Sequence, residues 1–201
     1  MTAYPRRDEP RRLIVGITGA TGTIYGVRLL EMLRDTDVET HLVLSRWAAR
    51  TLVHETAYTV EQVQALATHV HPITDQGAPI SSGSFITSGM IIVPCTVRTL
   101  AAVAHGLGDN LIHRAADVIL KERRRLVLAV REAPLNEIHL ENMLKLARLG
   151  AIIAPPMPAF YSRPRSIDEL VNYTVARLLD QLDIHLDVDK RWVGLPASAR
   201  T

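Results

Sequence analysis

The sequence has 201 residues, of which 47% are hydrophobic and 22% are charged, and its formal net charge is +2. This is typical of one folded domain with a substantial core, and the small charge gives no argument for nucleic-acid binding, so we expect no nucleic-acid partner. Cys95 is the only cysteine, which excludes an intrachain disulfide and a cysteine-based metal site. No apolar stretch reaches the roughly 18 residues of a membrane span, and nothing before Leu13 resembles a signal peptide, so we expect a cytoplasmic protein.

Predicted strands and helices alternate along the chain. In chain order, the apolar patterns predict strands at 13–18, 38–44, 90–93, 126–130 and 151–154, and helices at 23–34, 47–53, 60–68, 96–104, 110–124, 139–149 and 166–182. The strands are short and apolar throughout, which is typical of a parallel sheet covered on both faces. We therefore expect one doubly wound, Rossmann-like α/β domain at 12–193, with a basic tail at 1–11 and a second tail at 194–201.

The carboxyl ends of the strands should carry the function, because open α/β sheets bind ligands there. The first such loop reads GITGATGTIYG over residues 16–26. A dinucleotide fingerprint would place its last glycine at position 25, which is Tyr25, and no carboxylate for a ribose follows Leu44. The chain also lacks a Tyr-x-x-x-Lys pair and the Gly-Lys-Ser/Thr of a P-loop. These features argue against NAD and against a P-loop nucleotide.

Two loops rich in hydroxyl groups favour a flavin mononucleotide instead. Thr18, Thr21 and Thr23 open one helix, and the segment 94–99, which contains Arg98, opens another. Helix N-terminal amides can bind a phosphate, and small side chains can lie against a flavin ring. The alternative is a tight turn whose glycines serve packing alone.

Five segments in order resemble the UbiX-type flavin prenyltransferases. They are TGATG at 18–22, SSGS at 81–84, NLIHRAADVILKERR at 110–124, REAP at 131–134 and IHLENML at 138–144. The likeness covers residues 13–192, and the segments 81–85 and 155–161 are most similar to the branch of the family that forms a subunit of hydroxyarylic (phenolic) acid decarboxylases. The resemblance implies a flavodoxin-like fold.

The resemblance also implies a reaction. It implies transfer of dimethylallyl from dimethylallyl monophosphate to N5 and C6 of reduced FMN, without a metal. The product would serve a partner UbiD-type decarboxylase, and the enzyme would be a homo-oligomer, commonly a dodecamer. Two alternatives stay open: a non-catalytic FMN carrier, and an FMN-dependent cysteine decarboxylase. The Pro-x-Met-Asn signature of the latter is absent, because Pro158 follows Met157.

The same resemblance assigns site residues. Glu132 and Glu55 are the acid/base candidates and Lys121 the third catalytic candidate, with Glu132 assisting either phosphate departure or later proton removal. The residues assigned to FMN are Gly19, Ala20, Thr21, Ser45, Thr96, Val97, Arg98, Thr99 and Arg131. Those assigned to the prenyl phosphate pocket are Ser82, Gly83, Arg114, Lys121, Tyr161, Arg177 and Trp192.

Simpler roles remain open for several of these residues. Arg177 can pair with Asp180 within its own helix, although Leu170 and Tyr173 on the same face suggest a partly buried arginine. Arg114 and Lys121 can be a solvated pair, both glutamates can be surface residues, and Trp192 can serve packing.

Three other features could suggest a charged binding surface, a metal site or a nucleophile, and we expect none of these functions. The run 123–125 is expected to be a solvated helix end. His69-x-His71 has no third ligand at a suitable spacing, so we expect no metal site. Cys95 is expected to be a small buried residue, since no base accompanies it.

Overall fold

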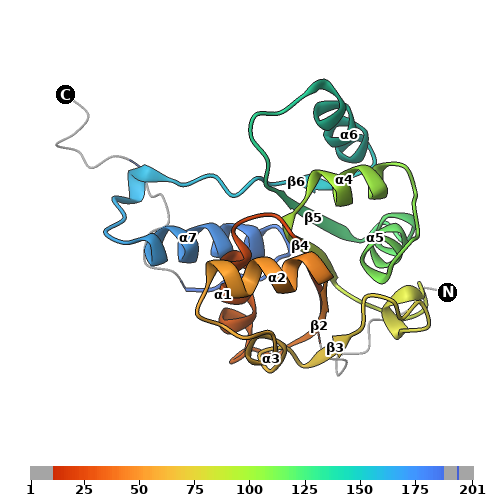
Figure 1. Ribbon diagram of the computed structural model, residues 1–201, viewed down its shortest axis with the longest axis horizontal. Coiled ribbons are helices and arrows are strands. Elements are labelled where there is room, and N and C mark those ends of the chain that lie inside the picture. The colour runs from red at the N-terminus through yellow and green to blue at the C-terminus, as the bar shows by residue number, and fades with distance from the viewer. Residues whose placement is uncertain (1–10, 188–193, 195–201) are drawn as a thin grey trace.

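The structure is a computed structural model that describes residues 11–187 and residue 194. Within these residues, six parallel strands form one sheet in the order β3-β2-β1-β4-β5-β6 (Figure 1). The strands are β1 (Arg11–Ile17), β2 (Val38–Leu44), β3 (His69–His71), β4 (Gly89–Cys95), β5 (Arg125–Val130) and β6 (Ile152–Ile153). The helices are α1 (Thr23–Leu33), α2 (Arg46–Glu55), α3 (Val60–Gln64), α4 (Val97–Ala104), α5 (Leu111–Lys121), α6 (Glu137–Arg148) and α7 (Ile167–Asp180), with 3-10 turns at Pro79–Ser81 and Phe160–Ser162. No helix in this part of the chain is long and apolar enough to cross a membrane.

Each face of the sheet packs against its own layer of helices. Successive strand residues point to opposite faces, so Leu13 and Val15 belong to the core beneath α1 and α7, whereas Ile14 belongs to the core beneath α4 and α5. Figure 1 shows α7 beside α1, with α4 and α5 gathered over the other half of the molecule. This arrangement confirms the predicted doubly wound α/β sheet.

Polar side chains fix the starts of three helices at the carboxyl edge of the sheet. Ser45, Thr96 and Asn110 are the N-caps of α2, α4 and α5. The side-chain oxygen of each accepts a hydrogen bond, of 3.0 to 3.1 Å, from the backbone amide three residues on. Such a cap stabilises a helix by about 1 kcal/mol. The caps therefore hold three helix N-termini at the edge where ligands of this fold bind.

The structure differs from the predicted elements between residues 60 and 71. The predicted helix at 60–68 starts as expected, at a capping box formed by Thr59 and Gln62, but ends at Gln64. Residues 69–71 form β3, which was not predicted, and pair with β2 so that His69 lies opposite His41. A three-residue edge strand has no apolar pattern of its own, so its pairing with β2 determines it. The strand β1 also begins one residue inside the tail expected at 1–11.

Candidate functional site

The loops after β1 and β4 meet at the topological switch point of the sheet, where the order of the strands reverses. The strand β1 lies between β2 and β4, and ligands of open α/β sheets bind outside the carboxyl ends of the strands at such a point. The hydroxyl of Thr18 donates to the Pro94 carbonyl at 2.7 Å and accepts a hydrogen bond from the Thr96 amide at 2.9 Å. Thr18 is 2% exposed, so both bonds are shielded from water. The two loops therefore form one connected wall.

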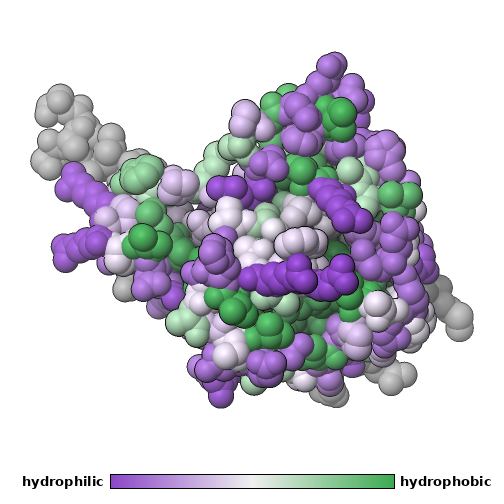
Figure 2. Space-filling model, viewed as in Figure 1, coloured by the Kyte–Doolittle hydropathy of each residue, from purple (hydrophilic) through white to green (hydrophobic). Residues whose placement is uncertain are grey.

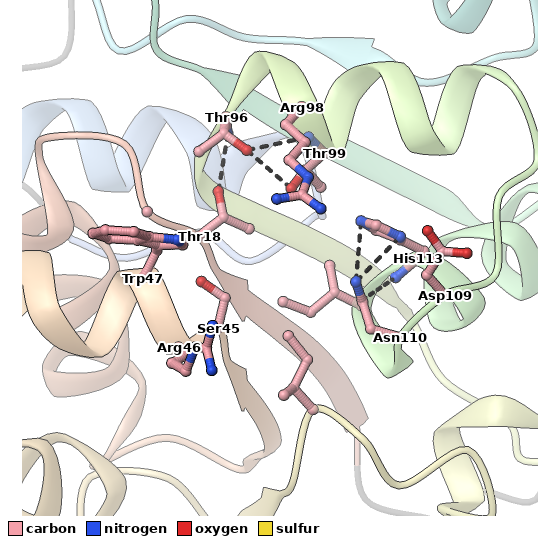
Figure 3. A pocket seen from close by; sticks show the side chains of 13 residues that line it. Thr18, Ser45, Arg46, Trp47, Thr96, Arg98, Thr99, Asp109, Asn110 and His113 are labelled. Atoms are coloured by element: carbon pink, nitrogen blue, oxygen red, sulfur yellow. Dashed lines mark hydrogen bonds between the residues drawn. The ribbon is translucent and has the colours of Figure 1, made fainter.

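A cavity of about 280 Å³ lies at this wall (Figure 3). Hydroxyl groups, two guanidinium groups and a few other polar side chains converge there beside Trp47, Ile73 and Ile112, and such a mixture of apolar surface and placed polar groups is typical of a small-molecule site. Five of the residues predicted to contact FMN line it: Gly19, Ser45, Thr96, Arg98 and Thr99. The other four, Ala20, Thr21, Val97 and Arg131, are outside the lining.

The cavity offers binding groups for an anion. Ser45 and Thr96 start α2 and α4 at its wall, so two helix N-termini with their positive partial charge lie there. Arg98 is exposed and adds a full positive charge. The arrangement can hold a phosphate-bearing ligand while the small side chains of Gly19 and Thr18 leave room for a flat ring.

Two glycines permit the close packing that shapes the first loop. A Cβ on Gly19 would lie 2.5 Å from the Cβ of Trp47. A Cβ on Gly26 would lie 2.7 Å from the Val93 carbonyl oxygen. Both separations are far below van der Waals contact. Close packing of α1 on β4 therefore accounts for Gly26, which falls one position later than a dinucleotide fingerprint requires.

Glu55 ends α2 and caps the N-terminus of α1. Its carboxylate accepts hydrogen bonds from the Gly22 amide at 2.9 Å and from the amide and hydroxyl of Thr23, each at 3.2 Å. Burial opposes the ionisation of Glu55, but these bonds and one from the Thr21 hydroxyl outweigh it and hold the pKa of Glu55 below its ordinary value. Thr21 and Glu55, which the resemblance assigned to different roles, thus contact each other.

The predicted phosphate ligands fall into two groups, the first of which lies along α5. The Nε of Arg114 donates to the Ser81 carbonyl at 3.1 Å. Gly83 approaches Lys121 so closely that a Cβ there would lie 2.8 Å from the ammonium nitrogen. The structure therefore places Arg114 and Lys121 beside the 81–83 loop. Each cation also pairs with a neighbouring carboxylate, on Asp117 and Glu122 respectively.

The prediction of a solvated helix end at 123–125 is wrong for Arg124, whereas Arg123 and Arg125 are exposed. Arg124 reaches back across the fold and donates to the carbonyls of Gly83 at 2.6 Å and Phe85 at 2.8 Å. Arg125 donates to the Gln181 carbonyl at 3.2 Å. Arg124 therefore fixes the backbone of the 81–85 loop.

The second group of phosphate ligands, Tyr161 and Arg177, lies elsewhere. The hydroxyls of Tyr161 and Tyr173 are hydrogen-bonded, and their rings meet edge to face with centroids 5.9 Å apart. Arg177 donates to Asp180 at 2.6 Å, the local pair that the sequence left open, and its side chain is 52% exposed rather than partly buried. Arg177 and Tyr173 line a second cavity, of about 340 Å³, beside β6. Neither Tyr161 nor Arg177 lines the cavity at the switch point.

Arg131 and Glu132 are exposed just after β5. The backbone amide of Arg131 donates to the Cys95 carbonyl at 3.0 Å. Burial raises the pKa of Tyr25, and the positive charge of the Arg131 side chain partly offsets this rise. The Glu132 carboxylate accepts a hydrogen bond from the Ala133 amide at 3.1 Å. Both side chains thus stand at the carboxyl end of β5, as predicted. Trp192 lies outside the described residues.

Comparison with known proteins identifies the family. A family model described as Flavoprotein matches residues 1–179. A probable UbiX-like flavin prenyltransferase of Bacillus subtilis is 58% identical over 184 residues, which are 92% of this chain and 90% of the relative. The chain belongs to the UbiX-like flavin prenyltransferases.

Two solved structures of the family resemble this chain, each with a TM-score of 0.89. One is AnUbiX (PadA1) in complex with FMN and dimethylallyl pyrophosphate, 52% identical, with 94% of this chain and 100% of that chain covered. The other is a dodecameric FMN-dependent UbiX-like decarboxylase from Escherichia coli O157:H7, 54% identical, with 91% and 100% covered. These comparisons confirm the family and the flavodoxin-like fold that the five sequence segments predicted.

Sequence reasoning missed several residues that line this prenyltransferase's cavity, among them Trp47, Asp109, Asn110 and His113. Asn110 lies within 3.2 Å of the His113 ring, and Figure 3 shows both across the cavity from Trp47. Burial lowers the pKa of His113, so its imidazole is neutral at neutral pH. The Asn110 N-cap was the available signal, because a helix that starts at the carboxyl edge presents its first residues to the ligand.

Cys95 is fully buried at the end of β4. Burial raises the pKa of its thiol to about 12, so the nucleophilic thiolate is not formed at neutral pH. The predicted role as a small buried residue is confirmed.

Hydrophobic side chains are exposed on two parts of the surface. The segment 157–167 carries Met157, Phe160 and Ile167, which are 73%, 70% and 78% exposed. The helix α6 carries Ile138 and Leu140, which are 64% and 53% exposed. Figure 2 shows green surface on both of these parts, which project from the body of the molecule with an indentation between them. Apolar patches of this kind mark protein–protein contacts.

Proposed function

We propose that this flavin prenyltransferase takes dimethylallyl from dimethylallyl monophosphate and attaches it to N5 and C6 of reduced FMN. The prenylated FMN then serves as cofactor for a partner UbiD-type decarboxylase. The observation that carries the proposal is the cavity at the β1–β4 switch point, with hydroxyl groups and Arg98 at two helix N-termini. The complex of the relative AnUbiX with FMN and dimethylallyl pyrophosphate supports it.

The residues at the cavity fit FMN. Ser45, Thr96 and Thr99 offer hydroxyls, α2 and α4 offer amides, and Arg98 offers a cation for the phosphate. Reduced FMN, when bound, supplies the two nucleophilic ring positions. The connected wall formed by Thr18 and Thr96 keeps the two loops in a fixed relation, so the ligand meets a preorganised site.

Dimethylallyl phosphate requires positive charge that makes phosphate a good leaving group. The Ser82–Gly83 loop, Arg114 and Lys121 form one such group, and Tyr161 and Arg177 are assigned to the same phosphate. Glu132 takes one of two proton roles: it protonates the departing phosphate or removes the proton from C6. Glu55, hydrogen-bonded to the loop that holds the flavin, keeps that loop in place beside the ring.

We propose further that the site is completed in a homo-oligomer, a dodecamer like the E. coli O157:H7 relative. Tyr161 and Arg177 do not line the cavity that Ser45 and Thr96 line. The exposed apolar side chains of 157–167 and α6 offer contact surface between copies. Residues 12–193 would be the flavin-binding unit, with tails at 1–11 and 194–201, and the enzyme would act in the cytoplasm.

Activation of the partner tests this function. The protein is incubated anaerobically with reduced FMN and dimethylallyl monophosphate, and the small-molecule fraction is added to a UbiD-type decarboxylase prepared without cofactor. We expect decarboxylase activity only when protein, flavin and donor were all present, and dimethylallyl pyrophosphate in a parallel reaction compares the donors. An inert fraction, from a reaction in which authentic prenylated FMN does activate the partner, would contradict the proposal.

A further inference from the structure

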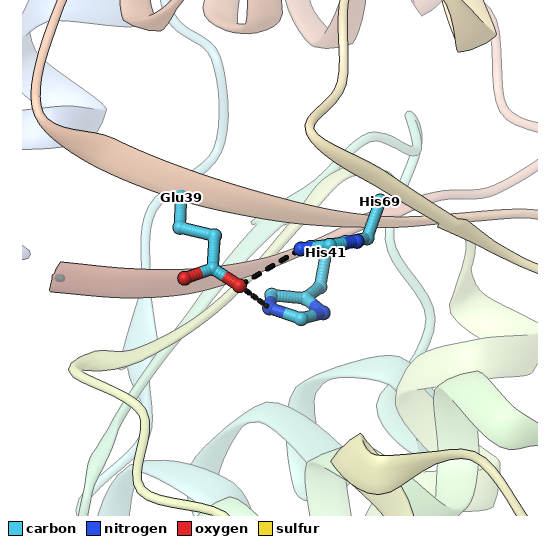
Figure 4. A group of neighbouring side chains, drawn as sticks. All are labelled: Glu39, His41 and His69. Carbon is cyan, nitrogen blue, oxygen red and sulfur yellow. Dashed lines mark hydrogen bonds and ion pairs between the residues drawn. The ribbon is translucent and has the colours of Figure 1, made fainter. Parts of the chain in front are cut away.

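A group of side chains at the edge of the sheet has the composition of a metal site. Among the residues that the structure describes, one group of three His, Cys, Asp or Glu side chains could share an ion: Glu39 and His41 of β2 and His69 of β3 (Figure 4). The Oε1 of Glu39 lies 3.2 Å from Nε2 of His41 and 2.9 Å from Nε2 of His69. Neighbouring ligand atoms around a tetrahedral zinc ion, with bonds of about 2.0–2.1 Å, are about 3.3 Å apart. The two separations from Glu39 are close to this value, and all three ligand atoms lie within 4.8 Å of one another.

The sheet holds these three side chains rigidly on one face. Glu39 and His41 are two residues apart on β2, so both point the same way, and His41 pairs in register with His69 of β3. Figure 4 shows both imidazoles directed at the same carboxylate. Ligands on paired strands are positioned more accurately than ligands on loops. No large backbone movement is therefore needed to bind an ion.

Two further residues lie within hydrogen-bond distance of the proposed ligands, on atoms that do not face the ion. The Nε2 of His71 lies 3.0 Å from Nδ1 of His41, and the Nε of Arg12 lies 3.3 Å from Oε2 of Glu39. A proton on Nδ1 of His41, donated to His71, leaves Nε2 with the lone pair that a metal needs. Arg12 occupies one carboxylate oxygen and leaves Oε1 for the ion. Second partners of this kind orient the ligands of protein metal sites.

The chemistry of the group fits a borderline divalent ion. Two imidazoles and one carboxylate are ligands of zinc sites with an open fourth position. The side chain of His41 is 4% exposed, whereas that of His69 is 49% exposed and gives an ion access from solvent.

We infer that Glu39, His41 and His69 bind one divalent ion of the Zn²⁺ class, which ties the short edge strand β3 to β2. The sequence did not reveal this site, because His69-x-His71 lacks a third ligand nearby and the fold supplies two from β2. His41, the ligand on β2 nearer to Ser45, precedes it by four residues, roughly 13 Å at about 3.3 Å per residue, so the ion lies away from the flavin cavity. The ion stabilises the fold and takes no part in prenyl transfer.

Calorimetric titration of the full-length, tag-free protein with ZnCl₂ tests the site. We expect one Zn²⁺ per chain in the wild type, and an affinity at least about tenfold lower in His69→Ala, because one of three ligands is lost. His69 is exposed, so this variant should fold. His54→Ala removes another exposed histidine and is the matched control, with wild-type affinity expected. Glu39→Gln should weaken binding as His69→Ala does.

Thermal unfolding with and without ZnCl₂ gives a second readout. Zn²⁺ should raise the unfolding temperature of the wild type and of His54→Ala but not of His69→Ala, because the ion binds only the folded pairing of β2 and β3. Equal Zn²⁺ affinity in the wild type and His69→Ala would place the ion elsewhere and overturn the inference. Absence of Zn²⁺ binding to the folded wild type would do the same, and would leave the group as a hydrogen-bonded relay.

Discussion

The hydroxyl of Thr18 accepts a hydrogen bond from the amide of Thr96 at 2.9 Å, and thereby joins the loop after β1 to the loop after β4. The same hydroxyl donates to the Pro94 carbonyl. These loops come from strands 78 positions apart in the sequence, yet together they form the wall of the proposed flavin cavity. A single buried side chain therefore links the two parts of the site.

Thr18→Val should lower both stability and FMN affinity. Valine has nearly the shape of threonine but leaves the part-buried Thr96 amide without its acceptor, which costs about 1–3 kcal/mol. Urea unfolding and fluorescence titration with FMN measure the two effects. Thr18→Ser, which keeps the hydroxyl, should retain most of both. Wild-type behaviour of Thr18→Val would show that this bond does not hold the loops together.

Gly19→Ala should weaken FMN binding by displacing Trp47. The added Cβ would lie 2.5 Å from the Cβ of Trp47 and 3.2 Å from its backbone carbonyl carbon, so α2 must shift at the cavity wall. Overpacking of this kind costs about 1–3 kcal/mol. Gly108→Ala is the control, because a Cβ at Gly108 meets nothing within 4 Å. Equal FMN dissociation constants for the two variants would sink this prediction.

In the acidic range, the free energy of unfolding of Glu55→Gln should depend less on pH than that of the wild type. The pKa of Glu55 is held below its ordinary value in the folded protein, so its carboxylate stabilises the fold above the unfolded pKa of about 4.3. That contribution is lost as the pH falls through the lower, folded pKa. Thermal unfolding between neutral and acidic pH should show a steeper loss for the wild type than for Glu55→Gln. Parallel curves would mean that Glu55 does not cap α1 as the structure has it.

Arg124→Lys should raise the KM for the prenyl phosphate and leave the FMN dissociation constant unchanged. Lysine lacks the planar fork with which Arg124 holds the carbonyls of Gly83 and Phe85, so the 81–85 loop loses its fixed backbone. The neighbouring Arg123→Lys is the matched control and should behave as wild type. Steady-state kinetics with varied donor, and flavin titration, separate the two effects. A change in FMN binding, or none in KM, would argue against this positioning role.

Much of the fold was predictable because its signals are local. Most positions of the buried strands are apolar, and the caps Ser45, Thr96 and Asn110 directly precede their helices. The strand β3 was not predictable in this way. His69-Val70-His71 is a strand because β2 lies beside it, and nothing within three residues encodes that neighbour.

The site was predictable where residues follow strand ends and unpredictable where long side chains reach across the fold. Ser45 and Thr96 come directly after strands, so topology alone placed them at one edge. Arg124 resembles a solvated helix end in sequence, but its guanidinium reaches a loop about 40 residues earlier in the chain. Arg177 is the opposite case, because it pairs with Asp180, a partner three residues on in the same helix that the sequence already suggested.

The mass of the flavin after reaction tests the central proposal most directly. The protein is incubated anaerobically with reduced FMN and dimethylallyl monophosphate, and the flavin is then released and weighed by mass spectrometry, beside a Glu132→Gln variant. We predict flavin heavier by one prenyl unit from the wild type, and little or none from Glu132→Gln, which still binds FMN. Bound FMN of unchanged mass from the wild type, with the monophosphate and the pyrophosphate donor alike, would contradict the proposed transfer.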